Sequence, residues 1–454
     1  MNPFNEPYSE EYRPQFHFTA QSNWLNDPNG LVYYEGEYHL FFQHNPVGIN
    51  WGNMHWGHAV SRDLIHWREL PVALSPDRLG TIFSGSAVVD WSNTTGFQTG
   101  EHPPLVAIYT AAGGDSPESE GQPYTQCLAY SNDRGRTWSK FEANPVLPHI
   151  VGQNRDPKVV WYAPQSCWIM SLFLDGEDFA LFRSPNLKHW TRLQTIHLPG
   201  ASECPDFFPL TVEDEPGQKY WIFSGANGCY LVGEFNGRGF TAIEGPICME
   251  LGANFYAVQT YSDIPVSDGR RVQIAWMAGG VYPRMPFNQQ MSIPSTLTLK
   301  RLPEGLRLFR YPVREIELLR GEAHHWRDLN VQAGDDLLSS VAGDLFEILI
   351  EAEDQLSGTW GIRVRGREIR YSFDNHTLSC LGRTASLAPI DGKIKLHILV
   401  DRTSIEIFAN GGQISMASCF APSAAETGLE LLTEGSPANI VSLDVYELRS
   451  SYEV

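Results

Sequence analysis

The chain has 454 residues and a mass of 51.0 kDa, which exceeds what one hydrophobic core usually serves, so we expect two or three domains. Hydrophobic residues make up 42% and charged residues 19%, a composition that excludes a disordered or low-complexity protein. The 53 acidic and 33 basic side chains give a net charge of −20, which repels phosphate backbones and anionic lipid. We therefore expect an uncharged ligand, with neither nucleic acid nor a membrane as a partner.

Two features bear on where the protein works. Residues 1–6 (MNPFNE) lack the basic flank and apolar run of a signal peptide, and no stretch approaches the roughly 20 apolar residues of a membrane helix. The seven cysteines form no CxxC pair, and their odd number cannot close completely into disulfides. These features predict a cytoplasmic protein with reduced thiols, or a secreted one if a signal peptide has been removed. The oligomeric state is left open.

From residue 16 to about residue 302 the chain is a succession of short β-type runs separated by turn residues, for example at 30–34, 38–42, 86–90 and 159–162. Three segments, 61–67, 131–138 and 184–190, echo one another. Each follows an apolar strand and predicts a tight turn that closes on a buried tryptophan. Their spacing is somewhat longer than usual for propeller blades but suits four-stranded units with long loops. This part is therefore predicted to be all-β, with a β-propeller as the preferred architecture.

The pattern changes after residue 301. Residues 312–320 carry apolar side chains at 313, 316 and 319, a helical spacing that predicts a linker helix. Alternating strands follow at 345–351, 394–400 and 404–408, and their period of two indicates a β-sandwich. We expect a propeller domain over residues 1–318 and a sandwich domain over residues 319–454.

Three carboxylates stand beside proline in short rigid segments: Asp27, Asp156 and Glu203. Each by itself is well explained as a turn former, because aspartate before proline is common in turns. They lie in different repeats, however, and a propeller brings the loops that begin its repeats to one central funnel. The three acids are thus candidates for one site.

Glycosidic cleavage is the chemistry that uses such acids without a thiol, a phosphate loop or a metal cluster. It requires one carboxylate as nucleophile or base and a second as general acid, with aromatic platforms for the sugar. Candidate platforms are Trp24, Trp51, Trp56, Phe83 and Trp276. Arg155 is expected to keep its neighbour Asp156 ionised.

Other groups of residues that could bind a metal or act as a nucleophile give weaker indications of a site. His55 and His58 are separated by an odd offset, which places them on opposite faces of a strand, so we expect buried, hydrogen-bonded histidines rather than metal ligands. Residues 175–178 (DGED) lack the ligand ladder of a calcium loop and predict a turn. Cys204 has no nearby histidine in the sequence, which favours a packing role over a nucleophile. No metal or organic cofactor is expected.

Several of these segments together resemble glycoside hydrolase family 32, the invertase, inulinase and levanase family, over nearly the whole chain. The resemblance is carried, in the family's order, by residues 24–30 (WLNDPNG), Gln43, 51–57 (WGNMHWG), 83–86 (FSGS), 155–157 (RDP), 203–205 (ECP) and 274–277 (IAWM). Residues 401–408 (DRTSIEIF) resemble the signature of the family's C-terminal sandwich.

The resemblance implies a five-bladed β-propeller followed by a β-sandwich. It also implies that Asp27 is the nucleophile, Glu203 the acid/base and Asp156 the residue that holds fructosyl hydroxyls. The residues implied around the terminal fructose are Asn26, Gln43, Trp51, Ser84 and Arg155. The expected activity is that of a retaining, exo-acting β-fructofuranosidase that releases fructose from sucrose, inulin, levan or fructo-oligosaccharides.

Two departures from the family pattern concern the substrate. Asn254 stands where the family often has aspartate, and residues 278–280 (AGG) follow Met277 in an unfamiliar way. Two rival functions stay open. A fructosyltransferase would use the same fructosyl-enzyme, and a carbohydrate-binding homologue would need the platforms but not all three acids.

Overall fold

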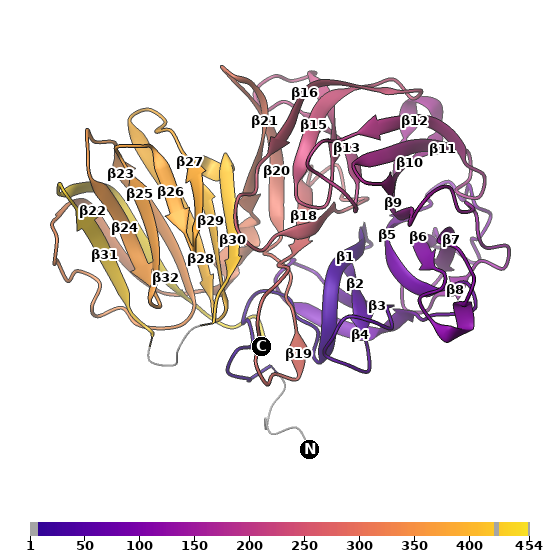
Figure 1. Ribbon diagram of the computed structural model, residues 1–454, viewed down its shortest axis with the longest axis horizontal. Coiled ribbons are helices and arrows are strands. Elements are labelled where there is room, and N and C mark those ends of the chain that lie inside the picture. The colour runs from indigo at the N-terminus through magenta and orange to yellow at the C-terminus, as the bar shows by residue number, and fades with distance from the viewer. Residues whose placement is uncertain (1–7, 422–425, 453–454) are drawn as a thin grey trace.

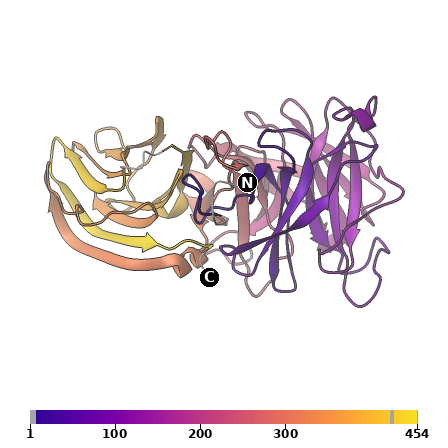
Figure 2. The same cartoon turned by 90° about the horizontal axis from the view of Figure 1, so that it is seen from below.

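The computed structural model describes residues 8–421 and 426–452, in which β-strands form two bodies side by side (Figure 1). Strands β1 to β21 make up the first body and β22 to β32 the second. Figure 2 shows the sheets of the second body as separate layers beside the first. Residues 1–6, on which the expectation about a signal peptide rests, lie outside the described residues.

The first body is a propeller of five sheets, as the resemblance implied. Blade 1 consists of β1 (Asn23–Tyr34), β2 (Glu37–Asn45), β3 (His55–Ser61) and β4 (Trp67–Leu74), with the short β19 (Phe287–Asn288) added beside β1. Blade 2 consists of β5 (Thr81–Val89), β6 (Leu105–Ala112), β7 (Thr125–Ser131) and β8 (Ser139–Lys140). Blade 3 consists of β9 (Arg155–Tyr162), β10 (Cys167–Asp175), β11 (Asp178–Ser184) and β12 (Thr191–His197).

The last two blades follow the same order. Blade 4 consists of β13 (Asp206–Thr211), β14 (Lys219–Ser224), β15 (Cys229–Phe235) and β16 (Phe240–Cys248). Blade 5 consists of β17 (Tyr256–Thr260), β18 (Arg271–Trp276), β20 (Ser295–Leu302) and β21 (Gly305–Pro312). Two short 3₁₀ helices, η1 (Pro117–Ser119) and η2 (Ala163–Gln165), lie in connections.

The first strands of the blades meet at the propeller axis and are joined there by side chains. Gln259 of β17 accepts a hydrogen bond from the Leu31 amide of β1 and donates one to the Gly85 carbonyl of β5. Farther along the axis the buried ammonium of Lys158 donates to the Thr260 carbonyl and lies 3.7 Å from the Asp206 carboxylate. The axis is therefore filled below the ends at which these strands begin.

The three echoed segments form the same turn in three blades. Each joins the third strand of its blade to the fourth, and each tryptophan is partly buried, with its indole Nε1 donating to the carbonyl three residues earlier. The donor–acceptor pairs are Trp67 to Leu64, Trp138 to Gly135 and Trp190 to Leu187. The predicted tight turns are confirmed, whereas the tryptophans are only partly buried.

The second body is a sandwich of two antiparallel sheets. The six-stranded sheet contains β22 (Arg320–Val331), β23 (Phe346–Glu353), β28 (Lys393–Asp401), β29 (Ser404–Ala409), β30 (Ile414–Cys419) and β32 (Ala438–Leu448). The five-stranded sheet contains β24 (Thr359–Val364), β25 (Arg367–Ser372), β26 (Thr377–Cys380), β27 (Arg383–Ser386) and β31 (Leu429–Glu434). A short 3₁₀ helix, η4 (Asn410–Gly412), follows β29.

The segment predicted as a linker helix is a 3₁₀ helix, η3 (Arg314–Leu319), between the two bodies. Its apolar side chains Ile316 and Leu319, together with Val313, are buried in a cluster that also contains residues of both bodies. The apolar spacing thus marked the buried side of this segment, although the backbone forms the tighter helix that is typical of short connectors.

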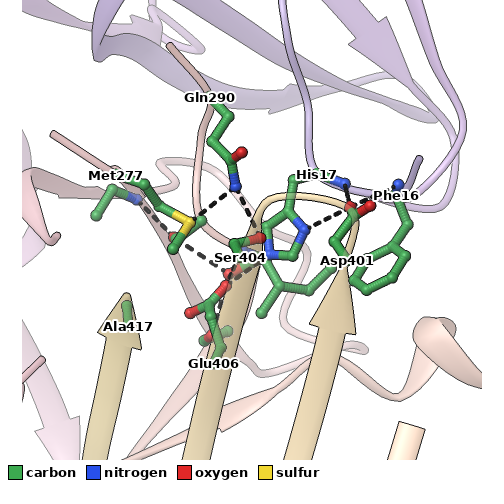
Figure 3. Close-up of polar contacts among 12 residues, drawn as sticks. Phe16, His17, Met277, Gln290, Asp401, Ser404, Glu406 and Ala417 are labelled. Carbon is green, nitrogen blue, oxygen red and sulfur yellow. Dashed lines mark hydrogen bonds and ion pairs between the residues drawn. The ribbon is translucent and has the colours of Figure 1, made fainter. Parts of the chain in front are cut away.

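A buried network of charged groups holds the two bodies together (Figure 3). The His17 ring, from the segment before β1, bonds Asp401 on one side at 2.8 Å and Glu406 on the other at 2.9 Å. Arg310 of β21 pairs with Glu406 at 2.7 Å and with Glu250 at 2.9 Å. All five side chains are at most 8% exposed, so each charge here depends on its buried partners, and the bonds of His17 and Arg310 to Glu406 cross the interface.

The cysteines differ in part from the expectation of reduced thiols. Cys229 and Cys248 form a disulfide, and the other five cysteines are free. The two partners face each other in register on the antiparallel strands β15 and β16, with Cα atoms 4.0 Å apart. Counting cysteines cannot reveal this pair, because strand register and not sequence spacing brings it together.

The described ranges also contain no helix of the length and apolar character needed to cross a bilayer.

Candidate active site

A cavity of about 400 Å³ opens at the end of the propeller where the first strands begin. Ten of the residues singled out in the sequence line it, while the proposed platforms Trp24 and Trp56 do not. The ten are Asn26, Asp27, Gln43, Trp51, Phe83, Ser84, Arg155, Asp156, Glu203 and Trp276. They come from all five blades or from the connections between them. The lining also includes four residues that the sequence did not single out, namely Asp115, Tyr124, Gln153 and Tyr256.

Asp27 lies on β1 and is held by neighbours on two blades. Its Oδ1 accepts a hydrogen bond from Asn26 Nδ2 at 3.0 Å, and its Oδ2 accepts one from Ser84 Oγ of β5 at 2.6 Å. Ser84 is followed on β5 by Gly85, and only glycine fits there because a Cβ would lie 2.1 Å from the Ile108 carbonyl oxygen. Burial raises the pKa of Asp27 even though the bonds from Ser84 and Asn26 act in the opposite direction.

Asp156 lies at the start of β9 and is tied to the segment before β13. Its Oδ2 accepts a hydrogen bond from the Cys204 amide at 3.0 Å, and the Cys204 thiol lies 3.5 Å from Asp156 Oδ2 and 3.6 Å from Asp27 Oδ2. Cys204 is therefore more than a packing residue, since its single thiol proton is within reach of both carboxylates and can be donated to either. Burial raises the pKa of its thiol well above the ordinary value, which opposes a role as thiolate nucleophile.

Glu203 receives two donors. Arg155 Nη2 donates to Glu203 Oε1, and the Tyr256 hydroxyl donates to Glu203 Oε2. The expectation that Arg155 keeps Asp156 ionised was wrong. Its guanidinium is 3.8 Å from Asp156 and pairs more closely with Glu203, and burial raises the pKa of Asp156 to about 7 despite the lowering effect of Arg155.

The backbone is left-handed at three positions of the site, two of which are adjacent. Asp156, Glu203 and Cys204 have φ values of 63°, 55° and 39°, a region that costs free energy for residues other than glycine. The Ala226 amide bonds the carbonyls of Ser202 and Glu203 at 3.1 Å and holds the second of these segments in place. The fold thus maintains a strained backbone where the carboxylates must point into the cavity.

Aromatic side chains line two sides of the mouth. Trp51, which is 51% exposed, meets Phe83 edge to face, and Trp276 on the other side donates its indole N–H to Gln289 at 3.0 Å. Two of the five proposed platforms have other roles. Trp56 is fully buried in the core, and Trp24 packs edge-on against Trp276 and donates to Asn26.

Gln43 faces the cavity with an unused donor. Its side chain is buried, and its Nε2 has no hydrogen-bond partner within residues 8–421 and 426–452. A buried amide without a partner is costly, and a sugar hydroxyl in the cavity would supply one.

The alternative sites behave as the sequence predicted, except that His55 is only half-buried. His58 is buried and bonds His39, whereas the half-buried His55 bonds the Asn53 carbonyl, so the two histidines share no ligand position. Residues 175–178 form the turn between β10 and β11.

The departure at Asn254 has a structural explanation. Its amide donates to the Ala278 carbonyl and its side-chain oxygen accepts from the Cys419 amide of β30 at 2.8 Å. Aspartate could not donate to a carbonyl. Asn254 therefore joins the connection after Trp276 to the sandwich, and it does not line the cavity.

Comparison with known proteins agrees with this architecture. The model of the glycosyl hydrolases family 32 N-terminal domain matches residues 17–312, and that of the family 32 C-terminal domain matches residues 315–447. A levanase from Bacillus subtilis (strain 168) is 41% identical over 97% of this chain and 71% of its own length. A second levanase, from Bacillus sp. (strain L7), is 34% identical, and this chain spans 53% of it.

Fungal relatives match along their whole length. An extracellular exo-inulinase from Aspergillus awamori is 32% identical over 98% of this chain and 96% of its own. The crystal structure of exo-inulinase from the same species has a TM-score of 0.89 at 30% identity, covering 99% of this chain and 100% of that one. A fructofuranosidase structure from Schwanniomyces occidentalis complexed with fructosylnystose has a TM-score of 0.87 at 26% identity, covering 98% and 99% of the two chains.

A propeller with three carboxylates in one sugar-sized cavity defines a glycoside hydrolase. The chain belongs to glycosyl hydrolase family 32.

Proposed function

We propose that the protein is an exo-acting, retaining β-fructofuranosidase that releases terminal β-D-fructose from sucrose, fructans and fructo-oligosaccharides. The observation that carries the proposal is the convergence of Asp27, Asp156 and Glu203, each with different hydrogen-bond donors, in one cavity closed along the propeller axis. The named activities of the levanase and exo-inulinase relatives support it.

In the first step the Asp27 carboxylate attacks the anomeric C2 of the fructosyl unit. The bond from C2 to the glycosidic oxygen breaks, and the carboxylic acid of Glu203 transfers its proton to that oxygen as the leaving sugar departs. Ser84 and Asn26 orient Asp27 for this attack. The product of the step is a covalent fructosyl-enzyme.

In the second step water replaces the leaving sugar. The Glu203 carboxylate accepts a proton from water, the water oxygen bonds to C2, and Asp27 leaves as a carboxylate. Asp156 and Gln43 are placed to bond the fructosyl hydroxyls through both steps. Two inversions at C2 give fructose with the configuration of the substrate.

Exo action follows from the shape of the site. The axis below the cavity is filled by side chains such as Lys158 and Asp206, so a chain can enter only by its end. The test is a time course on levan and inulin followed by chromatography. Fructose is expected as the first product from both, and a ladder of oligosaccharides before free fructose would contradict exo action.

The same experiment on concentrated sucrose separates hydrolysis from transfer, because both use the fructosyl-enzyme. Equal release of glucose and fructose supports the hydrolase. A persistent excess of glucose, with the missing fructose found in trisaccharides, would identify a fructosyltransferase. A protein that binds sucrose and releases neither sugar would be the non-catalytic homologue.

A further inference from the structure

The cavity consists of a buried floor and an exposed rim. The floor carries Asn26, Gln43, Ser84 and Asp156, none of them more than 6% exposed. The rim includes Asp115, Tyr124 and Gln153, which come from the connections between β6 and β7 and before β9. Because the floor is closed, the terminal fructose occupies it, and the leaving group must lie at the rim.

Asp115 presents a carboxylate to this rim in a fixed position. One of its oxygens, Oδ2, accepts a hydrogen bond from the buried hydroxyl of Thr81 at 2.7 Å. Within the described residues Asp115 has no ion pair, so neither a lysine nor an arginine neutralises it. Its second oxygen is available to accept hydrogen bonds from a ligand in the cavity.

The connection that carries Asp115 is internally braced. The Gly114 amide bonds the Ser119 carbonyl at 2.9 Å, and the Gln122 amide bonds the same carbonyl at 3.0 Å. Gly113 packs so closely on the returning chain that a Cβ there would lie 2.4 Å from the Gln122 carbonyl oxygen. The carboxylate is therefore presented by an ordered loop.

Tyr124 completes the rim beside Asp115. Its ring meets Phe83 edge to face at 5.6 Å, and Phe83 in turn meets Trp51 at 6.0 Å. Within the described residues the Tyr124 hydroxyl has no hydrogen-bond partner, although the ring is half-buried in the cavity wall. The rim thus offers a free phenol donor next to a carboxylate acceptor.

We propose that Asp115 and Tyr124 select the leaving group, and that they favour an uncharged sugar and disfavour a phosphorylated one. Sugar hydroxyls donate to the Asp115 carboxylate and accept from the Tyr124 hydroxyl. A phosphate on the leaving sugar is repelled by Asp115, and Arg155, the one cation among the described residues that line the cavity, already pairs with Glu203. This assignment rests on the proposed function and adds to it the chemistry of the leaving group.

The experiment compares three substrates that share the fructosyl unit. Sucrose has a neutral sugar as leaving group, sucrose 6-phosphate carries a phosphate on its glucosyl unit, and 4-nitrophenyl β-D-fructofuranoside has a leaving group without sugar hydroxyls. The variants are Asp115→Asn, whose side-chain oxygen can still accept from Thr81, and Tyr124→Phe. Asp214→Asn, the same change in an exposed turn of blade 4, is the matched control.

Asp115→Asn should lower kcat/KM for sucrose by about tenfold to a hundredfold, the loss expected for one charge-assisted hydrogen bond. It should change kcat/KM for the aryl fructoside less than about threefold and raise the ratio of sucrose 6-phosphate to sucrose hydrolysis. Tyr124→Phe should lower sucrose hydrolysis selectively without changing that ratio. Asp214→Asn should match the wild type on all three substrates.

Equal losses on sucrose and the aryl fructoside would overturn the assignment, and so would unchanged kinetics in both rim variants. An unaltered preference against sucrose 6-phosphate in Asp115→Asn would refute the role of charge. Failure of the proposed function is a separate outcome, because the wild type would then release fructose from neither sucrose nor the aryl fructoside.

Discussion

The carboxylates of the cavity differ in the groups that surround them, and the neighbours of Asp27 and of Glu203 fit two different roles. Burial raises the pKa of Asp27, and the neutral donors Ser84 and Asn26 counter that rise and orient the carboxylate. Glu203 is bonded by Arg155 and by the Tyr256 hydroxyl, and it stands in a segment held by Ala226. The donors around Asp27 fix the direction of the attacking oxygen, and those around Glu203 bond its carboxylate form, which accepts a proton from water in the second step.

Removal of the two groups should have different consequences. Asp27→Ala should lower kcat by roughly 10⁴-fold or more on every substrate, since no covalent intermediate can form. Glu203→Ala should lose about 10²-fold to 10⁴-fold on sucrose. It should lose less on 4-nitrophenyl β-D-fructofuranoside, whose leaving group needs no proton. Steady-state kinetics with and without azide measures this, with azide partly restoring Glu203→Ala.

A fructosyl azide of retained configuration from Asp27→Ala, together with one of inverted configuration from Glu203→Ala, would exchange the two roles. Azide that replaces the nucleophile attacks C2 directly and inverts it, whereas azide that replaces the base-assisted water attacks the fructosyl-enzyme and gives net retention. The configuration can be read by nuclear magnetic resonance spectroscopy.

At the scale of single elements, the connection between β18 and β19 is fixed by two amide side chains. Gln289 accepts from the Trp276 indole and donates to the Gly280 carbonyl at 3.1 Å, and Asn254 donates to the Ala278 carbonyl. This connection therefore holds the Trp276 wall of the cavity, and Asn254 links it to β30 of the sandwich.

Asn254→Asp should disturb this connection, because a carboxylate cannot donate to the Ala278 carbonyl and would face it unpaired. A loss of about 1–3 kcal/mol in stability is expected, together with a higher KM for sucrose as the Trp276 wall loosens. Melting temperature and initial-rate kinetics measure the two effects. Asn236→Asp is the matched control, since the Asn236 side-chain oxygen accepts from the Arg238 and Gly239 amides and an aspartate would retain both bonds. Equal behaviour of the two variants would contradict the role given to Asn254.

At the scale of the whole molecule, the propeller and the sandwich share one apolar cluster and one charged network. Phe16 before β1 and Phe408 of β29 belong to the same cluster. In the network, burial opposes a charge on His17, but the hydrogen bonds to Asp401 and Glu406 outweigh it and raise the pKa of His17 to about 9. His17 is thus a buried cation between two acids of the other body.

Because of this charge, we expect the contact between the propeller and the sandwich to lose stability as the pH rises into the alkaline range. The pKa of His17 is about 9 in the folded protein and near 6.5 in the unfolded chain, so its contribution is complete below about pH 6.5 and is lost between there and pH 9. The shift corresponds to roughly 3 kcal/mol as an order of magnitude. Melting temperatures of the wild type and His17→Gln should therefore differ most near pH 6 and converge near pH 9.5.

The exposed His189→Gln should follow the wild type at every pH. A constant difference between the wild type and His17→Gln over this range would show that the charge of His17 contributes nothing.

Much of the architecture and of the site was predictable because it is encoded locally. Period-two strands between turn residues indicated an all-β chain, and the echoed segments ending at Trp67, Trp138 and Trp190 form turns from their own side chains and carbonyls. The short motifs around Asp27, Asp156 and Glu203 placed their residues in the cavity for the same reason, since each motif carries its own backbone bend.

Which side chains from distant segments pair with one another could be decided only by the tertiary structure. Adjacency in the sequence suggested that Arg155 serves Asp156, but the left-handed bends at both segments turn its guanidinium toward Glu203. Asp115 stands in no pattern of its own, the bond from Tyr256 to Glu203 joins residues 53 positions apart, and Cys229 meets Cys248 through strand register. Local chemistry thus determines strands, turns and the motifs whose residues line the cavity, whereas the pairing of charges depends on which blades close around the axis.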